Sequence, residues 1–196
     1  GLSPRAPHVP PPIWSLPERL KPGHLVVPDQ AIDKTHGREA TFYEGAAVHV
    51  EMANPFCPAM RRWLLAASER LEDTTVHGAG TYVCMQGPAF STRAESLMHR
   101  SWGGDLIGMT CMPEAKLARE AEIAYALVAL PTDFDCWRPR ADGGGAEELL
   151  AEIIGNLEAA TAASIRLIRT ALDDVALLTE APSPSHDALK LAIWSD

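Results

Sequence analysis

The sequence has no clustered positive charge and no long apolar run. Its 17 lysine and arginine residues are outnumbered by 26 acidic residues, which gives a formal net charge of −9 at pH 7. Binding to nucleic acid needs a basic face that neutralises phosphates, and the longest basic run here is Arg61-Arg62. No apolar run approaches the roughly 18 residues of a membrane span, and the first residues lack a secretory signal pattern. We expect a cytoplasmic protein that binds neither nucleic acid nor membranes.

Patterns that hold metals or activate nucleophiles are also missing. The four cysteines, Cys57, Cys84, Cys111 and Cys136, have neither the spacing of a metal site nor the density of a disulfide framework. The histidines show no metal-ligand spacing, and the sequence contains no P-loop and no G-x-S-x-G turn. We therefore expect reduced thiols and no metal site.

The centre of the chain alternates between apolar strands and helices. Strands are predicted at Thr81–Met85, Asp105–Met109 and Ala124–Leu130. Between them, Thr92 and Glu95 form the T-x-x-E pattern of a helix N-terminus, and Pro113 suits the first turn of a second helix. This alternation favours an α/β fold with a parallel or mixed sheet covered by helices.

The flanking segments are delimited by prolines, glycines and apolar spacing. Residues 1–12 contain five prolines and predict an extended leader. Upstream of the centre we predict a strand at His24–Val27, a loop at Gln30–Gly45, a strand at Ala46–Met52 and a helix that begins at Pro58. Downstream, the apolar spacing predicts a long amphipathic helix at Ala146–Leu172, followed by a tail with a short apolar segment.

Each central strand leads into a loop with groups that could bind a small ligand. These groups are Phe90-Ser91, Met109-Thr110 and Thr132–Asp135. In open α/β sheets, ligands bind outside the carboxyl ends of the strands. Structural alternatives exist for the first two: a buried Phe beside a helix start, a Met in the core, and a Thr that caps the next helix instead of binding an anion.

Asp133 and Asp135 are the most specific feature. Alternate residues of an extended segment point to the same side, so both carboxylates can face one ligand while Phe134 faces away. The Hoogsteen edge of adenine presents its N7 acceptor beside the N6 amino donor, which suits one protonated and one ionised carboxyl group. Protonation of N7 makes the purine a leaving group. The structural alternative is a solvated acidic turn or a helix cap.

The sequence GTYVCMQGPAFSTRAES, followed by SWGGDLIGMT and PEAKLAREAEIAYALVALPTDFDCW, closely resembles the S-methyl-5′-thioadenosine phosphorylases, which are trimeric members of the purine nucleoside phosphorylase family. The upstream segments DQAIDKTHGREATFYEG and NPFCP match as well. The resemblance implies an α/β phosphorylase fold with a central mixed sheet flanked by helices. It implies a phosphorylase domain at residues 15–176, after a leader at 1–14 and before a tail at 177–196 with a short helix.

The resemblance also implies residue roles. Asp133 and Asp135 would bind the purine and protonate it, and Thr110 would contact phosphate. The other substrate contacts would come from Phe90, Ser91, Met109, Thr132 and Phe134, and from His49 reaching into a neighbouring subunit. Specificity would depend on Ser91, Ala146, Leu149 and Leu150.

The reaction that the resemblance implies is phosphorolysis of S-methyl-5′-thioadenosine to adenine and 5-methylthioribose 1-phosphate, in methionine and purine salvage. Inorganic phosphate is the co-substrate, no cofactor or metal is needed, and the enzyme is a homotrimer. The family's Gly-rich strand-turn, Arg-His pair and Thr-Ala segment, which bind phosphate, have no counterpart in this sequence. We therefore expect a chain truncated at its N-terminus.

Two alternative functions stay open. One is a non-catalytic fragment that binds adenine nucleosides without a phosphate site. The other is a 6-oxopurine nucleoside phosphorylase, which Asp133 disfavours because the 6-oxo acceptor would face an ionised carboxylate.

Overall fold

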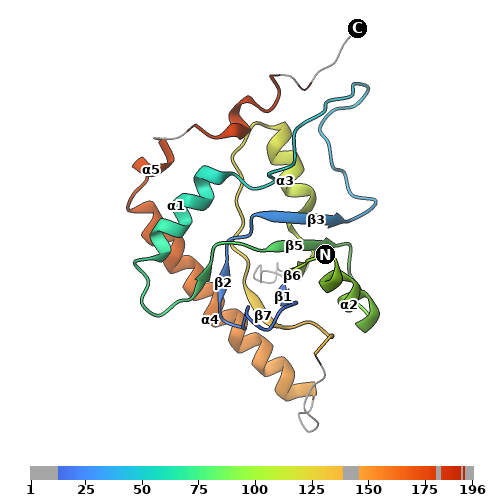
Figure 1. The fold of residues 1–196 in the computed structure, drawn as a ribbon, viewed down its shortest axis with the longest axis vertical. Coiled ribbons are helices and arrows are strands. Elements are labelled where there is room, and N and C mark those ends of the chain that lie inside the picture. The colour runs from blue at the N-terminus through green and yellow to red at the C-terminus, as the bar shows by residue number, and fades with distance from the viewer. Residues whose placement is uncertain (1–12, 139–145, 180–181, 191, 193–196) are drawn as a thin grey trace, which may run out of the picture.

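A computed structural model describes residues 13–138, 146–179, 182–190 and 192, with the side chains of 146–149 and 179 outside that description (Figure 1). A five-stranded sheet in the order β3-β5-β6-β1-β7 forms the centre, and β2 pairs with β4 beside it. The strands are β1 (Ile13–Ser15), β2 (Leu25–Val26), β3 (Gln30–Lys34), β4 (Val76–His77), β5 (Thr81–Met85), β6 (Leu106–Gly108) and β7 (Pro131–Phe134).

The sheet is mixed, and β1 is where its direction changes. Strands β3, β5 and β6 are parallel to one another, whereas β1 is antiparallel to β6 and parallel to β7. The predicted α/β fold with a central mixed sheet is confirmed. Because β7 runs against β6, its carboxyl end lies at the opposite edge of the sheet from the carboxyl ends of β5 and β6. The expectation that three loops gather at one edge is therefore wrong.

In the described part of the chain, six helical segments surround the sheet (Figure 1). They are α1 (Pro58–Ser68), α2 (Arg93–Ser101), α3 (Cys111–Glu120), α4 (Ala146–Leu172), α5 (Ala176–Thr179) and a 3-10 helix at Pro184–Asp187. The predicted start of α1 at Pro58 and the predicted bounds of α4 are confirmed. The predicted capping box of α2 is present, with reciprocal hydrogen bonds between Thr92 and Glu95. In the tail, the described helical segments are the last residues of α5 and the 3-10 turn.

The two faces of the sheet pack against different helices. Ile13, Tyr82 and Leu106 belong to a buried cluster that includes residues of α3. Their neighbours in sequence, Trp14, Val83 and Ile107, form a second cluster with Leu16 on the opposite face. Helix α2 covers that face. A Cβ added at Gly104, just after the helix, would touch Val83 and Leu16 of the sheet side and the His99 carbonyl of α2, so the two lie in direct contact there. A third cluster joins α1 and α4 to β2.

Three predicted elements are wrong. The loop predicted from Gln30 begins as strand β3, which pairs in parallel with β5 over five residues. It is the edge strand of the sheet, where Gln30, Asp33 and Lys34 are polar while Ala31 and Ile32 pack against the buried clusters on the two faces. Ala46–Met52 forms no strand; within it, His49 donates its backbone N–H to the Ala192 carbonyl. Ala124–Leu130 is not a strand either, apart from one bridge between Ala129 and Val26.

The segment 124–130 shows why the apolar pattern misled. Tyr125 and Leu127 pack against the cluster near α3, while Ala126, Val128 and Leu130 pack against the cluster of α1 and α4. Alternate side chains of this segment are buried in two different clusters, which explains the apolar alternation. The backbone does not form the hydrogen bonds of a strand. The strand forms further on, at β7.

The boundary predicted after residue 14 leaves Ile13 and Trp14 outside the domain. Both lie in β1 and are buried in the sheet, so the folded domain includes them. All four cysteines are unpaired. Among the described residues, no helix is both long and apolar enough to span a membrane, and no group of three His, Cys, Asp or Glu residues is placed to hold a metal ion.

The guanidinium group of Arg38 ties the ends of β5 and β6 together. It donates to the backbone carbonyls of Met85 (3.3 Å), Gln86 (2.8 Å), Met109 (2.8 Å) and Met112 (2.6 Å). Its Nε also donates to the Gln86 side chain at 3.0 Å. These carbonyls lie where two strands end and α3 begins, so one side chain satisfies the acceptors of three segments.

We expect Arg38→Lys to lower the free energy of unfolding by about 2–4 kcal/mol, because an ammonium group cannot reach all four carbonyls and leaves partly buried acceptors unpaired. Urea denaturation of the purified variant measures this change. Arg62→Lys, at an exposed position of α1, is the matched control and should change stability by less than about 0.5 kcal/mol. Equal effects of the two substitutions would contradict the structural role of Arg38.

His24 and His77 connect β4 to the turn before β2. Nδ1 of His24 lies 2.9 Å from Nε2 of His77 and also faces the backbone N–H of Lys21 at 3.4 Å. Nδ1 is therefore the acceptor and His77 the donor. Burial, followed by the Lys21 charge, lowers the pKa of His24; burial, followed by the charges of His24 and Arg19, lowers the pKa of His77.

These pKa values predict acid sensitivity. In the unfolded chain the two histidines bind protons near pH 6.5, whereas in the folded protein they bind protons only at lower pH. Stability that is present above pH 6.5 is therefore lost progressively as the pH falls below it. We expect the urea midpoint to fall between pH 7 and pH 5, and to fall less in a His24→Asn, His77→Asn double variant. An exposed-site control, His186→Asn, should keep the wild-type slope. An unchanged slope in the double variant would rule the pair out as its source.

Candidate functional site

The end of β7 carries the two predicted acidic residues. Asp133 lies in the strand, and its Oδ1 accepts a hydrogen bond from the Thr132 hydroxyl at 2.8 Å. Asp135 follows the strand, is buried, and donates its backbone N–H to the Ser15 carbonyl at 3.0 Å. The fully buried Thr132 is held by Ile13 through its hydroxyl and by Asn156 of α4 through its carbonyl. Both acidic residues are thus fixed to β1 by backbone pairing.

Asp135 faces a group of buried polar side chains on α2. Ser96 and His99 lie one turn apart on the buried face of that helix, and the charge of Asp135 acts on His99. Lys34 of β3 donates to Nε2 of His99 at 2.9 Å, which leaves the imidazole proton on Nδ1. Burial, with the Lys34 charge, lowers the pKa of His99 and keeps the ring neutral near neutral pH.

Three buried polar atoms in this region have no hydrogen-bond partner among the described residues: Ser96 Oγ, His99 Nδ1 and Asp135 Oδ2. Buried polar groups are almost always paired in folded proteins, so each such atom calls for an explanation. Asp135 Oδ2 can accept a hydrogen bond and His99 Nδ1 can donate one. On the α2 face of the sheet, these atoms therefore have hydrogen-bonding positions that no described residue fills.

The loop after β5 crosses this face and reaches β7. Ser91 accepts a hydrogen bond at its carbonyl from the Cys136 thiol at 3.2 Å, and Arg93 donates to the Cys136 carbonyl at 3.3 Å. The Ser91 hydroxyl itself points at the Met85 sulfur, 3.8 Å away. Phe90 packs edge-to-face on Trp14, with ring centroids 4.7 Å apart. The loop therefore carries Phe90 and Ser91 to the side of the sheet that holds Asp133.

Met109 and Thr110 diverge at the end of β6. The Met109 side chain packs against the cluster around Trp14, on the same face as Phe90 and Asp133. The Thr110 hydroxyl lies 3.4 Å from the hydroxyl of Tyr82, whose ring belongs to the α3 face. Thr110 precedes α3 without capping it through its side chain. The structure thus brings Met109, but not the Thr110 hydroxyl, to the acidic residues.

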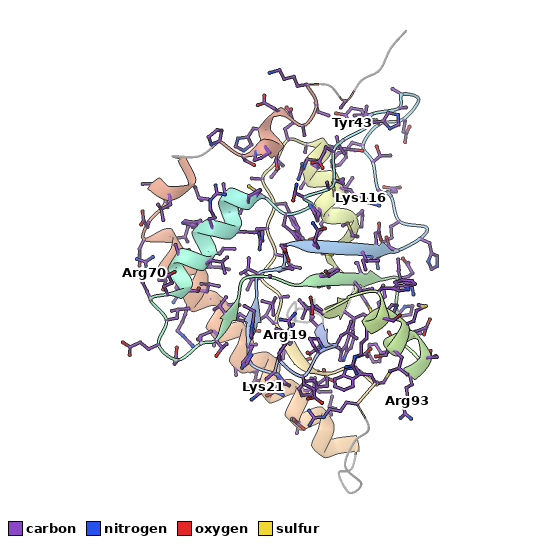
Figure 2. The ribbon with its side chains drawn as sticks, in the orientation of Figure 1. Arg19, Lys21, Tyr43, Arg70, Arg93 and Lys116 are labelled. Atoms are coloured by element: carbon purple, nitrogen blue, oxygen red, sulfur yellow. The ribbon has the colours of Figure 1, made fainter. Side chains whose placement is uncertain are left out.

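Of the remaining predicted site residues, His49 lies apart from this group, whereas Phe134 lies between the two acidic residues in the sequence. His49 is exposed and lines a cavity of about 700 Å³ together with Glu51, Arg119, Asp187 and Lys190, among others. Figure 2 shows Tyr43, from the same β3–α1 segment, and Arg93, at the start of α2, on opposite sides of the molecule. Phe134 packs on Trp137 with centroids 6.0 Å apart. Leu150 of α4 is 58% exposed, and the side chains of Ala146 and Leu149 lie outside the described residues.

Sequence reasoning missed Trp14, Lys34, Arg38 and His99 as parts of the site. Trp14 was assigned to the proline-rich leader, although a Trp before Ser15-Leu16 is an unusual residue for an extended leader. Lys34 and Arg38 lay in a segment predicted as loop. A long polar segment of this kind is often functional, and this was the signal available. His99 has no spacing pattern in the sequence that would mark it as part of a site.

The mixed sheet covered by helices makes this an α/β protein, and the face that carries an aromatic ring, a methionine and two carboxylates is its candidate small-molecule site. Comparison with known proteins gives the family. The model of the phosphorylase superfamily matches residues 15–173, and the chain belongs to that superfamily.

Similar proteins share most of this chain. The S-methyl-5′-thioadenosine phosphorylase of Thermosynechococcus vestitus is 47% identical over 184 residues, covering 92% of this chain and 62% of that protein. A crystal structure of a methylthioadenosine phosphorylase from an Antarctic soil metagenomic library is 44% identical with a TM-score of 0.80, covering 94% of this chain and 63% of that one.

A variant of the adenosine/methylthioadenosine phosphorylase from Schistosoma mansoni, in complex with methylthioadenosine, is 34% identical with a TM-score of 0.70. That match covers 88% of this chain and 64% of the solved one. In all three cases this chain spans less than two thirds of the similar protein.

Gly87 positions the Phe90 loop against Met109. Its φ of +64° lies in the left-handed region, and a Cβ there would come within 2.6 Å of the Met109 sulfur. We expect Gly87→Ala to cost about 1–3 kcal/mol of unfolding free energy, because it combines backbone strain with displacement of Met109. Gly155→Ala on α4, where a Cβ has open space, should instead be neutral or stabilise by up to about 1 kcal/mol. Thermal melts of both variants test the contrast, which fails if the signs agree.

Proposed function

We propose that this protein catalyses the phosphorolysis of S-methyl-5′-thioadenosine to adenine and 5-methylthioribose 1-phosphate. The observation that carries the proposal is the placement of Asp133 beside the buried Asp135, on the sheet face that also holds Phe90 and Met109. Similarity to proteins named methylthioadenosine phosphorylase, at 44–47% identity over more than nine tenths of the chain, supports it.

The two carboxyl groups would recognise the purine. One of them, protonated, donates to N7 while the other, ionised, accepts from the N6 amino group. Asp135 Oδ2 supports this role, because a buried acceptor without a partner among the described residues is available to a ligand's N–H. As the bond from C1′ to N9 breaks, the proton moves onto N7 and the base leaves neutral, while a phosphate oxygen forms the new bond to C1′.

Other groups would hold the sugar and the phosphate. Met109 contacts the ribose in this proposal, and Thr110 contacts phosphate, which requires its hydroxyl to turn from Tyr82. His49 acts on the substrate of a neighbouring subunit in a homotrimer; its exposure in a cavity lined by Arg119 and Asp187, away from Asp133, is consistent with that arrangement. Inorganic phosphate is the co-substrate, no cofactor takes part, and the reaction belongs to cytoplasmic methionine and purine salvage.

The leading alternative is a 6-oxopurine nucleoside phosphorylase. A 6-oxo group is an acceptor and would meet an ionised carboxylate, and such mismatches discriminate strongly between bases. Comparison of methylthioadenosine with methylthioinosine as substrates separates the two possibilities.

We expect Asp133→Asn to lower kcat/KM for methylthioadenosine by about 10²–10⁴-fold, because it removes either the N6 acceptor or the N7 proton donor. The ratio of methylthioadenosine to methylthioinosine turnover should shift towards the 6-oxo substrate. Phosphate-dependent release of free base, followed by chromatography, measures both quantities in the 196-residue chain.

Asp173→Asn at the exposed end of α4 removes the same charge and should leave kcat/KM unchanged. An unaltered substrate ratio in Asp133→Asn would contradict the assignment of the base-binding edge. Absence of phosphate-dependent turnover in the wild-type chain would contradict catalysis by this chain and leave purine binding as the function to test.

A further inference from the structure

The indole of Trp14 lies at the centre of the proposed base site. Trp14 sits in β1, directly between β6 and β7 in the sheet, and is only 8% exposed. In the register of the sheet its Cα is opposite Asp133 of β7, and residues paired across parallel strands point to the same face. The indole therefore emerges from the sheet next to the Asp133 side chain.

The same indole contacts the other groups that would hold the base. Phe90 approaches it edge-to-face, at 4.7 Å between centroids and an interplanar angle of 63°. No planar ring can stack between two aromatic side chains in that arrangement, because their surfaces already touch. Met109 packs against the buried cluster to which Trp14 belongs. Phe90, Met109 and Asp133 thus surround one side chain.

The chemistry of the occupant fits the site. Indole and purine are both planar fused bicyclic rings of similar size, and both pack edge-to-face or stacked on aromatic neighbours. Phe90 itself is 66% exposed, so its ring covers the indole from the solvent side and is not buried by other residues. The space beside Asp133 that a purine needs is filled by a ring of nearly the same shape.

We propose that Trp14 controls entry of the purine: its indole occupies the base position, and a purine binds only when the indole leaves it. This inference rests on the proposed base site at Asp133 and Phe90. It assigns to Trp14 a role in setting affinity for the base that is separate from the chemistry of the carboxylates. The apparent affinity is then reduced by the fraction of molecules in which the position is open.

Calorimetric titration of the 196-residue chain with adenine tests the proposal. Trp14→Ala should bind adenine at least about tenfold more tightly than wild type, as expected if fewer than about one molecule in ten is open. Phe42→Ala, which removes an exposed aromatic ring from the segment between β3 and α1, is the control and should bind like wild type. Equal affinity of Trp14→Ala and wild type, or no binding by either, overturns the proposal.

A second measurement covers the case in which Trp14→Ala does not fold. The wild-type chain labelled with 5-fluorotryptophan, with the Trp14 resonance assigned from Trp14→Phe, is titrated with adenine and followed by ¹⁹F NMR. Displacement of the indole predicts a large shift of that resonance and little change for Trp63, which lies against α4. A Trp14 resonance that does not move overturns the proposal.

Failure of the inference and failure of the proposed function can be told apart. In the Trp14→Ala background, Asp133→Asn should abolish most of the gain in adenine affinity. If the gain in adenine affinity survives Asp133→Asn, the indole does block a purine site, but the Asp133 carboxylate does not bind the base. If wild type turns over methylthioadenosine and Trp14→Ala gains no affinity, the proposed function stands and the role of Trp14 is refuted.

Discussion

The partly buried guanidinium of Arg38 is the interaction on which the site depends. It binds four backbone carbonyls drawn from the end of β5, the end of β6 and the start of α3. Those carbonyls would otherwise need water or other donors at the point where the backbone must stay ordered. Because the Phe90 loop leaves β5 and the Met109 side chain ends β6, the position of both follows from this contact. Arg38 therefore fixes the positions of Phe90 and Met109 through their backbone, although Arg38 itself does not face the proposed ligand.

The candidate site lies over a face of the sheet, whereas the general rule for open α/β sheets places ligands outside the carboxyl ends of the strands. The reason is the reversal at β1, which turns the carboxyl end of β7 away from those of β5 and β6. The loop after β5 compensates by crossing the α2 face until Ser91 meets Cys136. With strands of three to five residues the distances involved are short. Groups from opposite edges, such as Met109 and Asp135, can therefore flank one buried cluster.

Local signals predicted local structure well. The capping box at Thr92 and Glu95, the proline at the start of α1 and the apolar period of α4 are properties of neighbouring residues, and each element formed where it was predicted. The acidic pair at β7 was also visible, because its spacing alone suggests a shared direction. What escaped prediction depends on partners far along the chain. Strand β3 exists because β5 lies beside it. The contacts of Arg38 and His99 are made with carbonyls and a lysine that lie 47 to 74 residues away in the sequence.

Strand β1 has a consequence for how the chain reaches its fold. Its three residues come near the beginning of the sequence, yet their hydrogen-bonding partners lie in β6 and β7, in the second half. Pairings that span so much chain close large loops and form slowly compared with helices such as α1 or α4. During synthesis, Ile13 and Trp14 stay exposed as an apolar segment until β6, more than 90 residues further along the chain, has been made, and their second partner strand comes only with β7. Completion of the sheet is therefore a late event, and the centre of the candidate site is among the last parts of the molecule to assemble.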